Sequence, residues 1–221
     1  MKKNKLNYLE KIAFNVIDSL NKKGAHTNPV KIKQNIKEFL EKISLKFTEY
    51  LPLNSKGIDI GAGLGILSEL LKPRIIYNLD INPPKEGYGI QIKGDAEDIN
   101  FEGESFDFAL LFYAFNHFKN QEKAFSEMYR IVKNKGYIIA MMEFSRYKGQ
   151  EHLIKLNELS MNKIIYGKNC FSEEINPLKK KDFERMINYF SLKRISIEKF
   201  PPTQKIDFIF KSSKYLYVLQ K

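Results

Sequence analysis

Three alternating glycines follow an apolar segment that contains one acid. Residues 57–60 predict a buried strand, and Gly61, Gly63 and Gly65 come directly after it. Glycine lacks a Cβ, so the chain can take conformations there that other residues avoid, and a ligand can lie against the bare backbone. The dinucleotide fingerprint Gly-x-Gly-x-x-Gly would place its third glycine at Ile66, which disfavours a pyrophosphate. The junction favours a ligand that contains a nucleoside.

A second acid ends the next predicted strand. The run Ile-Ile-Tyr-Asn-Leu-Asp over residues 75–80 ends at Asp80, nineteen positions after Gly61. Ligands of open α/β sheets bind outside the carboxyl ends of the strands, and a carboxylate there can accept hydrogen bonds from two ribose hydroxyls. An acid near a glycine often serves only the turn, by accepting hydrogen bonds from nearby amides. That alternative stays open for Asp59 and Asp95, whereas the position of Asp80 favours function.

Further blocks follow in a fixed order. They are Gly-Asp-Ala-Glu-Asp at 94–98, Ser-Phe-Asp-Phe-Ala-Leu-Leu at 105–111, Asn-His-Phe at 116–118 and a segment at 127–136 that ends in Asn-Lys-Gly. Together with the glycine turn and Asp80, they resemble the class I S-adenosylmethionine-dependent methyltransferases, in particular the small-molecule branch. The resemblance runs roughly from residue 56 to residue 145. The family more commonly has Pro-Gly-Gly where this chain has Asn-Lys-Gly, which keeps one glycine for the turn.

The resemblance implies a set of residues that bind S-adenosylmethionine. Asp59 and the glycine turn would cradle the methionine part, and Asp80 would hold the ribose. Asp95 with Ala96 would face the adenine, and Phe112 would line the floor under the sulfonium. The complete predicted cofactor site is Asp59, Gly61, Ala62, Gly63, Gly65, Asp80, Ile81, Asp95, Ala96 and Phe112.

Methyl transfer from a sulfonium is a direct displacement with an activated leaving group, so the protein mainly aligns the reacting atoms. A base is needed only if the acceptor carries a proton. His117 follows the predicted fourth strand and is the first candidate, because imidazole titrates near neutral pH. Glu143, at the end of the fifth strand predicted over residues 137–142, is the second, and Tyr113 could orient a substrate. Each of the three can instead be a wall residue of the site.

The predicted strands and helices that position these residues indicate a doubly wound α/β fold, with a mostly parallel seven-stranded sheet and an N-terminal helical cap. We expect the cap over residues 1–53, built from two helices, and the methyltransferase domain over 54–221. A substrate-side insertion is expected at about 143–171, followed by a helix that starts at Asn176 and Pro177. Two alternating segments near the end predict strands, and the resemblance implies that they form the family's final antiparallel pair.

The formal net charge of +11 is unevenly distributed. Residues 1–56 carry twelve Lys and Arg against five Asp and Glu, residues 57–145 carry nine against thirteen, and residues 146–221 carry sixteen against eight. Basic flanks around an acidic core could mark an anionic substrate, an RNA or an acidic carrier protein. A compositional bias toward lysine explains the same charge without any partner.

Cys170 is the only cysteine, which excludes an intramolecular disulfide and a thiolate metal cluster. The three histidines, His26, His117 and His152, do not have the spacing of a metal site, so no metal is expected. The chain starts with a charged segment and lacks a long apolar run, which predicts a cytoplasmic protein without a membrane span. The oligomeric state stays open.

The predicted function is S-adenosylmethionine-dependent methyl transfer to a small-molecule acceptor. Residues 112–115 lack the Asn/Asp-Pro-Pro-aromatic motif of amino methyltransferases that act on adenine or glutamine. No cysteine lies near the predicted active-site strands, which excludes a cysteine-nucleophile mechanism. Two alternatives remain: an RNA methyltransferase that uses the basic flanks, and a catalytically silent methyltransferase-like protein that binds a partner.

Overall fold

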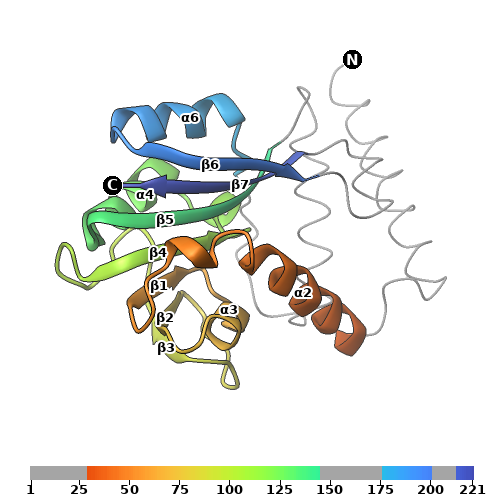
Figure 1. The fold of residues 1–221 in the computed structure, drawn as a ribbon. Helices are drawn as coiled ribbons and strands as arrows, with labels where there is room; N and C mark the ends of the chain where they lie inside the picture. Colours follow the sequence, from red (N-terminus) through yellow and green to blue (C-terminus); the bar gives the residue numbers. More distant parts are fainter. Residues whose placement is uncertain (1–28, 145–175, 201–212) are drawn as a thin grey trace, which may run out of the picture.

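A seven-stranded sheet in the order β3-β2-β1-β4-β5-β7-β6 forms the centre of the molecule (Figure 1). The computed structural model describes residues 29–144, 176–200 and 213–221. All strands run parallel except β7, which is antiparallel to both of its neighbours. The strands are β1 Lys56–Ile60, β2 Ile75–Asp80, β3 Ile90–Lys93, β4 Phe106–Phe112, β5 Val132–Phe144, β6 Lys193–Phe200 and β7 Ser213–Gln220. The predicted fold class is confirmed.

The topology places a ligand-binding edge at the carboxyl ends of β1 and β4. The chain passes outward from β1 through β2 to β3, and then crosses to the other side of β1 to form β4. Neighbouring loops diverge at such a switch point and leave a crevice outside the sheet. The central strands are apolar on both faces, as expected for parallel strands covered by helices, and Phe108 to Leu111 are fully buried.

Helices cover both faces of the sheet. On one face, Leu40 and Ile43 of α2 join Leu67 of α3 in a single buried cluster with Phe108 and Leu110 of β4. Figure 1 shows α2 beside α3 on this side of the sheet. The helical elements are α2 Pro29–Ser44, η1 Thr48–Tyr50, α3 Ile66–Leu70, η2 Phe115–His117, α4 Gln121–Ile131 and α6 Lys180–Tyr189.

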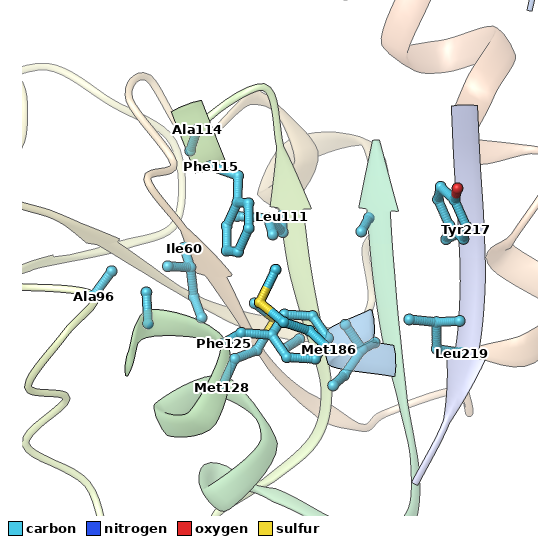
Figure 2. Packing of buried hydrophobic residues seen from close by; sticks show 14 of the residues in the cluster. Ile60, Ala96, Leu111, Ala114, Phe115, Phe125, Met128, Met186, Tyr217 and Leu219 are labelled. Atoms are coloured by element: carbon cyan, nitrogen blue, oxygen red, sulfur yellow. The ribbon is translucent and has the colours of Figure 1, made fainter. Parts of the chain in front are cut away.

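The other face carries α4 and α6. Figure 2 shows Phe125 and Met128 of α4 packed with Met186 of α6 below Phe115. The Phe115 ring folds back from the end of β4 toward Leu111 and lies 6.2 Å from the Phe125 ring, centroid to centroid. The start of the segment after β4 is therefore anchored in the hydrophobic core.

Two boundaries differ from the predictions. The last helix begins at Lys180, and not at Asn176, because the polar groups of Asn176 serve another segment. Its N–H donates to the Asn116 carbonyl at 2.6 Å, and its side-chain amide donates to the Phe118 carbonyl at 3.1 Å. β5 extends at both ends beyond the predicted residues 137–142. The antiparallel pair β6–β7 is confirmed.

α2 corresponds to the second predicted cap helix. The first cap helix and residues 145–171 of the predicted insertion lie outside the described residues. The division into a cap and a methyltransferase domain stays a prediction. No helix within the described ranges is long and apolar enough to cross a membrane.

Candidate cofactor and active site

The glycine turn follows β1 in the left-handed backbone region that favours glycine. Gly61, Gly63 and Gly65 have φ angles of 71°, 53° and 67°. The Gly61 N–H donates to the Leu79 carbonyl at 2.8 Å, which ties the turn to β2. A Cβ on Gly61 would collide with the Cβ of Ala114, the second residue after β4. The turn therefore touches the neighbouring strand end at the switch point.

Asp80 ends β2 and is 9% exposed. One of its carboxylate oxygens accepts a hydrogen bond from the Gly63 N–H at 3.0 Å, and the other accepts one from the Asn82 N–H at 2.9 Å. A carboxylate offers about four acceptor positions, so each oxygen can accept a second hydrogen bond. The acid thus lies at the glycine turn, where it can receive two further donors.

Asp59 lies in β1 and is 3% exposed. Burial, together with the negative charge of Asp80, raises the pKa of Asp59 to about 7. Within the described ranges, no hydrogen bond or ion pair reaches its carboxylate. A buried carboxylate without a partner is costly. A ligand that brings a positive charge with N–H donors would offset this cost, so the site fits an ammonium group.

His117 lies in η2, close enough to Asp80 for an electrostatic interaction. Burial lowers the pKa of His117, and the negative charge of Asp80 partly opposes this effect. The imidazole is therefore neutral near pH 7, and a neutral imidazole can accept a proton. The electrostatic interaction with Asp80 places His117 at the same edge of the sheet as the glycine turn.

Residues 58–140 match a family model described as a methyltransferase domain. This part of the chain is a methyltransferase domain. A solved structure from Methanosarcina mazei with the same fold is described as an S-adenosylmethionine-dependent methyltransferase. A comparison with curated proteins found no match.

Solved structures with the same fold span most of the methyltransferase. An S-adenosylmethionine-dependent methyltransferase from Archaeoglobus fulgidus has a TM-score of 0.62 and 17% identity, over 84% of this chain and 94% of the other. One from Thermotoga maritima, described as a possible histamine N-methyltransferase, has a TM-score of 0.56 and 19% identity, over 89% and 99%. The [4+2]-cyclase SpnF has a TM-score of 0.59 and 9% identity, over 82% and 80%. At these identities the likeness shows the fold alone.

Two aromatic residues of the methyltransferase follow one another at the end of β4. The Phe112 ring lies 5.6 Å from the Phe47 ring, and the Tyr113 ring lies 6.4 Å from that of Phe39 in α2. Tyr113 has a φ angle of 58°, which is uncommon and costly for a residue with a side chain. Its N–H donates to the Met141 carbonyl at 3.2 Å, which helps to hold this conformation. α2 thus borders the site at the end of β4.

The predicted adenine-side residues lie next to β2. The Gly94 N–H donates to the Asp80 carbonyl at 3.0 Å, which brings the following loop to the strand end. Ala96 is buried, whereas Asp95 is exposed and accepts a hydrogen bond from the Glu97 N–H at 2.9 Å. This bond is the turn chemistry that forms the alternative for Asp95. Ile81 follows Asp80 and is 61% exposed, so its side chain is available to a ligand.

Glu143 is half-buried and lies farther from this group. It pairs with Lys214 across β5 and β7, two residues beyond Met141, which pairs with Phe112. Since alternate residues of a strand share a face, Glu143 projects on the same side of the sheet as Met141. The structure brings together Asp59, the glycine turn, Asp80 and His117, and leaves Glu143 one strand farther along the same edge.

The sequence predictions missed two polar groups that support the site. Asn78 is fully buried in β2, and its only signal was an amide within an otherwise apolar strand. Glu127 and Arg130 of α4 pair at 2.7 Å, and they hold the backbone of Ile99 and Phe101 through further hydrogen bonds.

Among the described residues, no three His, Cys, Asp or Glu side chains are grouped so that they could hold a metal ion.

Proposed function

We propose that this methyltransferase transfers the methyl group of S-adenosylmethionine to a small-molecule acceptor by direct displacement, without a metal ion. The observation that carries the proposal is the pair of acids at the ends of β1 and β2, joined by the glycine turn. The buried Asp59 carboxylate suits an ammonium group, and the Asp80 carboxylate can accept two more hydrogen bonds. These are the features that the methionine and ribose parts of the cofactor need.

Each predicted residue then has a role. Asp59 and the backbone of Gly61, Ala62, Gly63 and Gly65 hold the methionine part. Asp80 binds the ribose, with Ile81, Asp95 and Ala96 around the adenine, and Phe112 lines the floor of the site. When bound, S-adenosylmethionine supplies a methyl group on a positively charged sulfur, which is already an activated leaving group. The protein therefore has to orient the acceptor and exclude water.

If the acceptor carries a proton, we propose His117 as the base. The neutral imidazole can accept a proton near pH 7. Glu143 is the second candidate, and Tyr113 orients the acceptor. We place acceptor specificity in residues 1–53 and 143–171, which flank the cofactor core in the sequence.

The carboxylates and aromatic rings at the carboxyl ends of the strands favour a small acceptor over RNA. Asp59, Asp80 and Glu143 carry carboxylates there, and the rings of Phe39 in α2 and of Phe47 after it pack on the end of β4. Like charges repel a polyanion, whereas a small acceptor needs to meet only the local surface. The Thermotoga maritima relative, described as a possible histamine N-methyltransferase, would act on a small amine. An anionic small acceptor remains compatible if the basic flanks hold its charge.

The first test is calorimetric titration of the full chain with S-adenosylmethionine, with NAD as a control. We expect binding of S-adenosylmethionine alone, unchanged by bulk tRNA at low and high salt. Strong salt-dependent binding of tRNA would favour the RNA methyltransferase instead. Absence of S-adenosylmethionine binding would refute the proposal.

Asp80→Ala tests the site within the same titration. Loss of a charged acceptor for two hydroxyls should weaken cofactor binding about a hundredfold, because hydrogen bonds to charged groups are the stronger ones. Unchanged affinity would contradict the assignment. If S-adenosylmethionine binds but no S-adenosylhomocysteine forms with a panel of amines, phenols and carboxylates, the catalytically silent alternative gains support.

A further inference from the structure

A fully buried amide joins three segments on the β2 side of the site. The Asn78 side-chain oxygen accepts a hydrogen bond from the Ser68 hydroxyl of α3 at 2.8 Å. Its side-chain nitrogen donates to the Tyr88 carbonyl at 2.6 Å. The first hydrogen bond is buried and the second is partly buried, and a buried amide has few alternative partners. Asn78 therefore connects β2, the helix after the glycine turn, and loop 81–89 between β2 and β3.

Tyr88 is held from a second direction. Its N–H donates to the Leu64 carbonyl, inside the glycine turn, at 2.9 Å. Its carbonyl also accepts a hydrogen bond from the Gln91 side chain at 2.6 Å. The far end of loop 81–89 is thus docked on the glycine turn through the backbone of one residue.

The glycines around Asn78 are explained by this docking. A Cβ on Gly65 would collide with the Asn78 amide and lie 2.7 Å from the Tyr88 carbonyl oxygen. A Cβ on Gly89 would lie 2.6 Å from the Ser68 hydroxyl and 2.8 Å from the Asn78 nitrogen. Both glycines have positive φ angles. The third glycine of the turn consequently permits the approach of Asn78 and Tyr88.

The near end of the loop is held by Asp80. Its carboxylate accepts hydrogen bonds from Asn82 in the loop and from Gly63 in the turn. Asp80 and Asn78 are two residues apart in β2, so both side chains project toward the face that carries α3. The loop is therefore fixed at one end by a group that must also bind the ligand, and at the other end by Asn78.

We propose that Asn78 is a positioning residue for the adenosine side of the cofactor. By fixing the far end of loop 81–89, it lets the Asp80 carboxylate keep its geometry when the ribose hydroxyls bind, and it holds Ile81 in place. This inference rests on the proposed function for the ligand, whereas the docking of the loop does not.

The test compares Asn78→Ala with Ser68→Ala. The second variant removes the hydrogen bond from Ser68 to Asn78 and leaves the one from Asn78 to Tyr88. The control is Tyr217→Phe, which removes the 2.9 Å hydrogen bond from a buried hydroxyl to Glu184 in α6, on the far side of the sheet. The probes are S-adenosylhomocysteine and 5′-methylthioadenosine, which carries the adenosine part without the amino acid. Calorimetry gives the dissociation constants, and thermal unfolding gives the stability of each variant.

We expect Asn78→Ala to weaken both probes by a similar factor of about ten, the worth of a buried hydrogen-bond pair, and Ser68→Ala to weaken both by about threefold. Tyr217→Phe should leave both unchanged. Unchanged binding in folded Asn78→Ala, or an equal loss in Tyr217→Phe, would overturn the inference. If Asn78→Ala does not fold, Ser68→Ala decides by the same comparison.

Hydrogen exchange of the ligand-free protein separates this inference from the proposed function. The Tyr88 amide should exchange about tenfold faster in Asn78→Ala than in the wild type, while core amides of β4 change only with global stability. Equal exchange would refute the docking role. If the wild type binds neither probe, the proposed function and the ligand role both fail, and exchange still decides the docking.

Discussion

Replacing Asp59 with asparagine separates the effect of this acid on the stability of the fold from its effect on cofactor binding. Burial and the charge of Asp80 raise the pKa of Asp59 to about 7, against an ordinary value of 3.8. Between these values the folded chain keeps a proton that the unfolded chain has lost, so the acid destabilises the fold as the pH rises through this window. A shift of about 3 pH units corresponds to at most about 4 kcal/mol above pH 7. The Asp59→Asn substitution would remove this cost, because an amide is neutral at every pH.

The assay is urea unfolding of the ligand-free protein. We expect Asp59→Asn to be more stable than the wild type near pH 8 by up to about 4 kcal/mol, and this advantage to shrink by about 2 kcal/mol near pH 5.5. Cofactor affinity should fall at least about tenfold, because the ammonium group loses a charged partner. The variant would thus be the more stable protein and the weaker binder.

Asp107→Asn is the matched control. Burial opposes ionisation of Asp107, but the hydrogen bonds from Lys133 and the Lys56 backbone outweigh it and lower its pKa. This acid stabilises the fold above its unfolded pKa, so the variant should lose roughly 1 kcal/mol, equally near pH 5.5 and near pH 8. An Asp59→Asn difference that is the same at both pH values would refute the argument for burial. Undiminished cofactor affinity would refute the role at the ammonium group.

Two further substitutions probe the same edge. With an acceptor that must lose a proton, His117→Gln should lower kcat/KM about a hundredfold. It should also abolish the fall in rate at acidic pH, which in the wild type is centred below the usual histidine pKa because burial lowers the pKa of His117. An unaltered pH–rate profile would exclude the base role. Gly61→Ala should reduce the unfolding free energy by about 2 kcal/mol, because it combines a positive φ angle with a collision at Ala114. Gly103→Ala is its control: the new Cβ would lie 3.5 Å from the nearest atom, and a loss as large as that of Gly61→Ala would contradict the argument.

The central strands of the sheet could be predicted because β1 and β4 are buried on both faces and therefore appear as apolar runs. The helix start at Asn176 was wrong for a tertiary reason. The sequence Asn-Pro is typical of a helix start, but the Asn176 amide and N–H bind residues near position 117 instead. β5 begins earlier than predicted because Val132 pairs with Phe106, a contact that the polar residues 133–135 do not indicate. Local propensity was overridden in both cases by long-range hydrogen bonds.

The candidate site was partly predictable from spacing. Asp80 and the glycines follow strands at positions that the doubly wound fold makes functional. The docking role of Asn78 could not be predicted, because its partners Ser68 and Tyr88 meet it only through the packing of α3 and loop 81–89. The perturbed pKa of Asp59 likewise depends on complete burial, which a single strand does not specify.

The two ends of the sheet differ in how their polar groups are satisfied. At the amino end, Asp107 accepts hydrogen bonds from the Lys56 backbone and the Lys133 ammonium group, and the Lys221 ammonium group donates to two carbonyls. At the carboxyl end, the buried Asp59 lies beside a second acid, Asp80, whose charge raises the pKa of Asp59 further. Costs of this kind persist only where the surrounding structure enforces them, and they concentrate at functional sites. Because a cation offsets the charge of Asp59, and Asp107 at the amino end already has its hydrogen-bond partners, ligand binding should stabilise the carboxyl edge selectively.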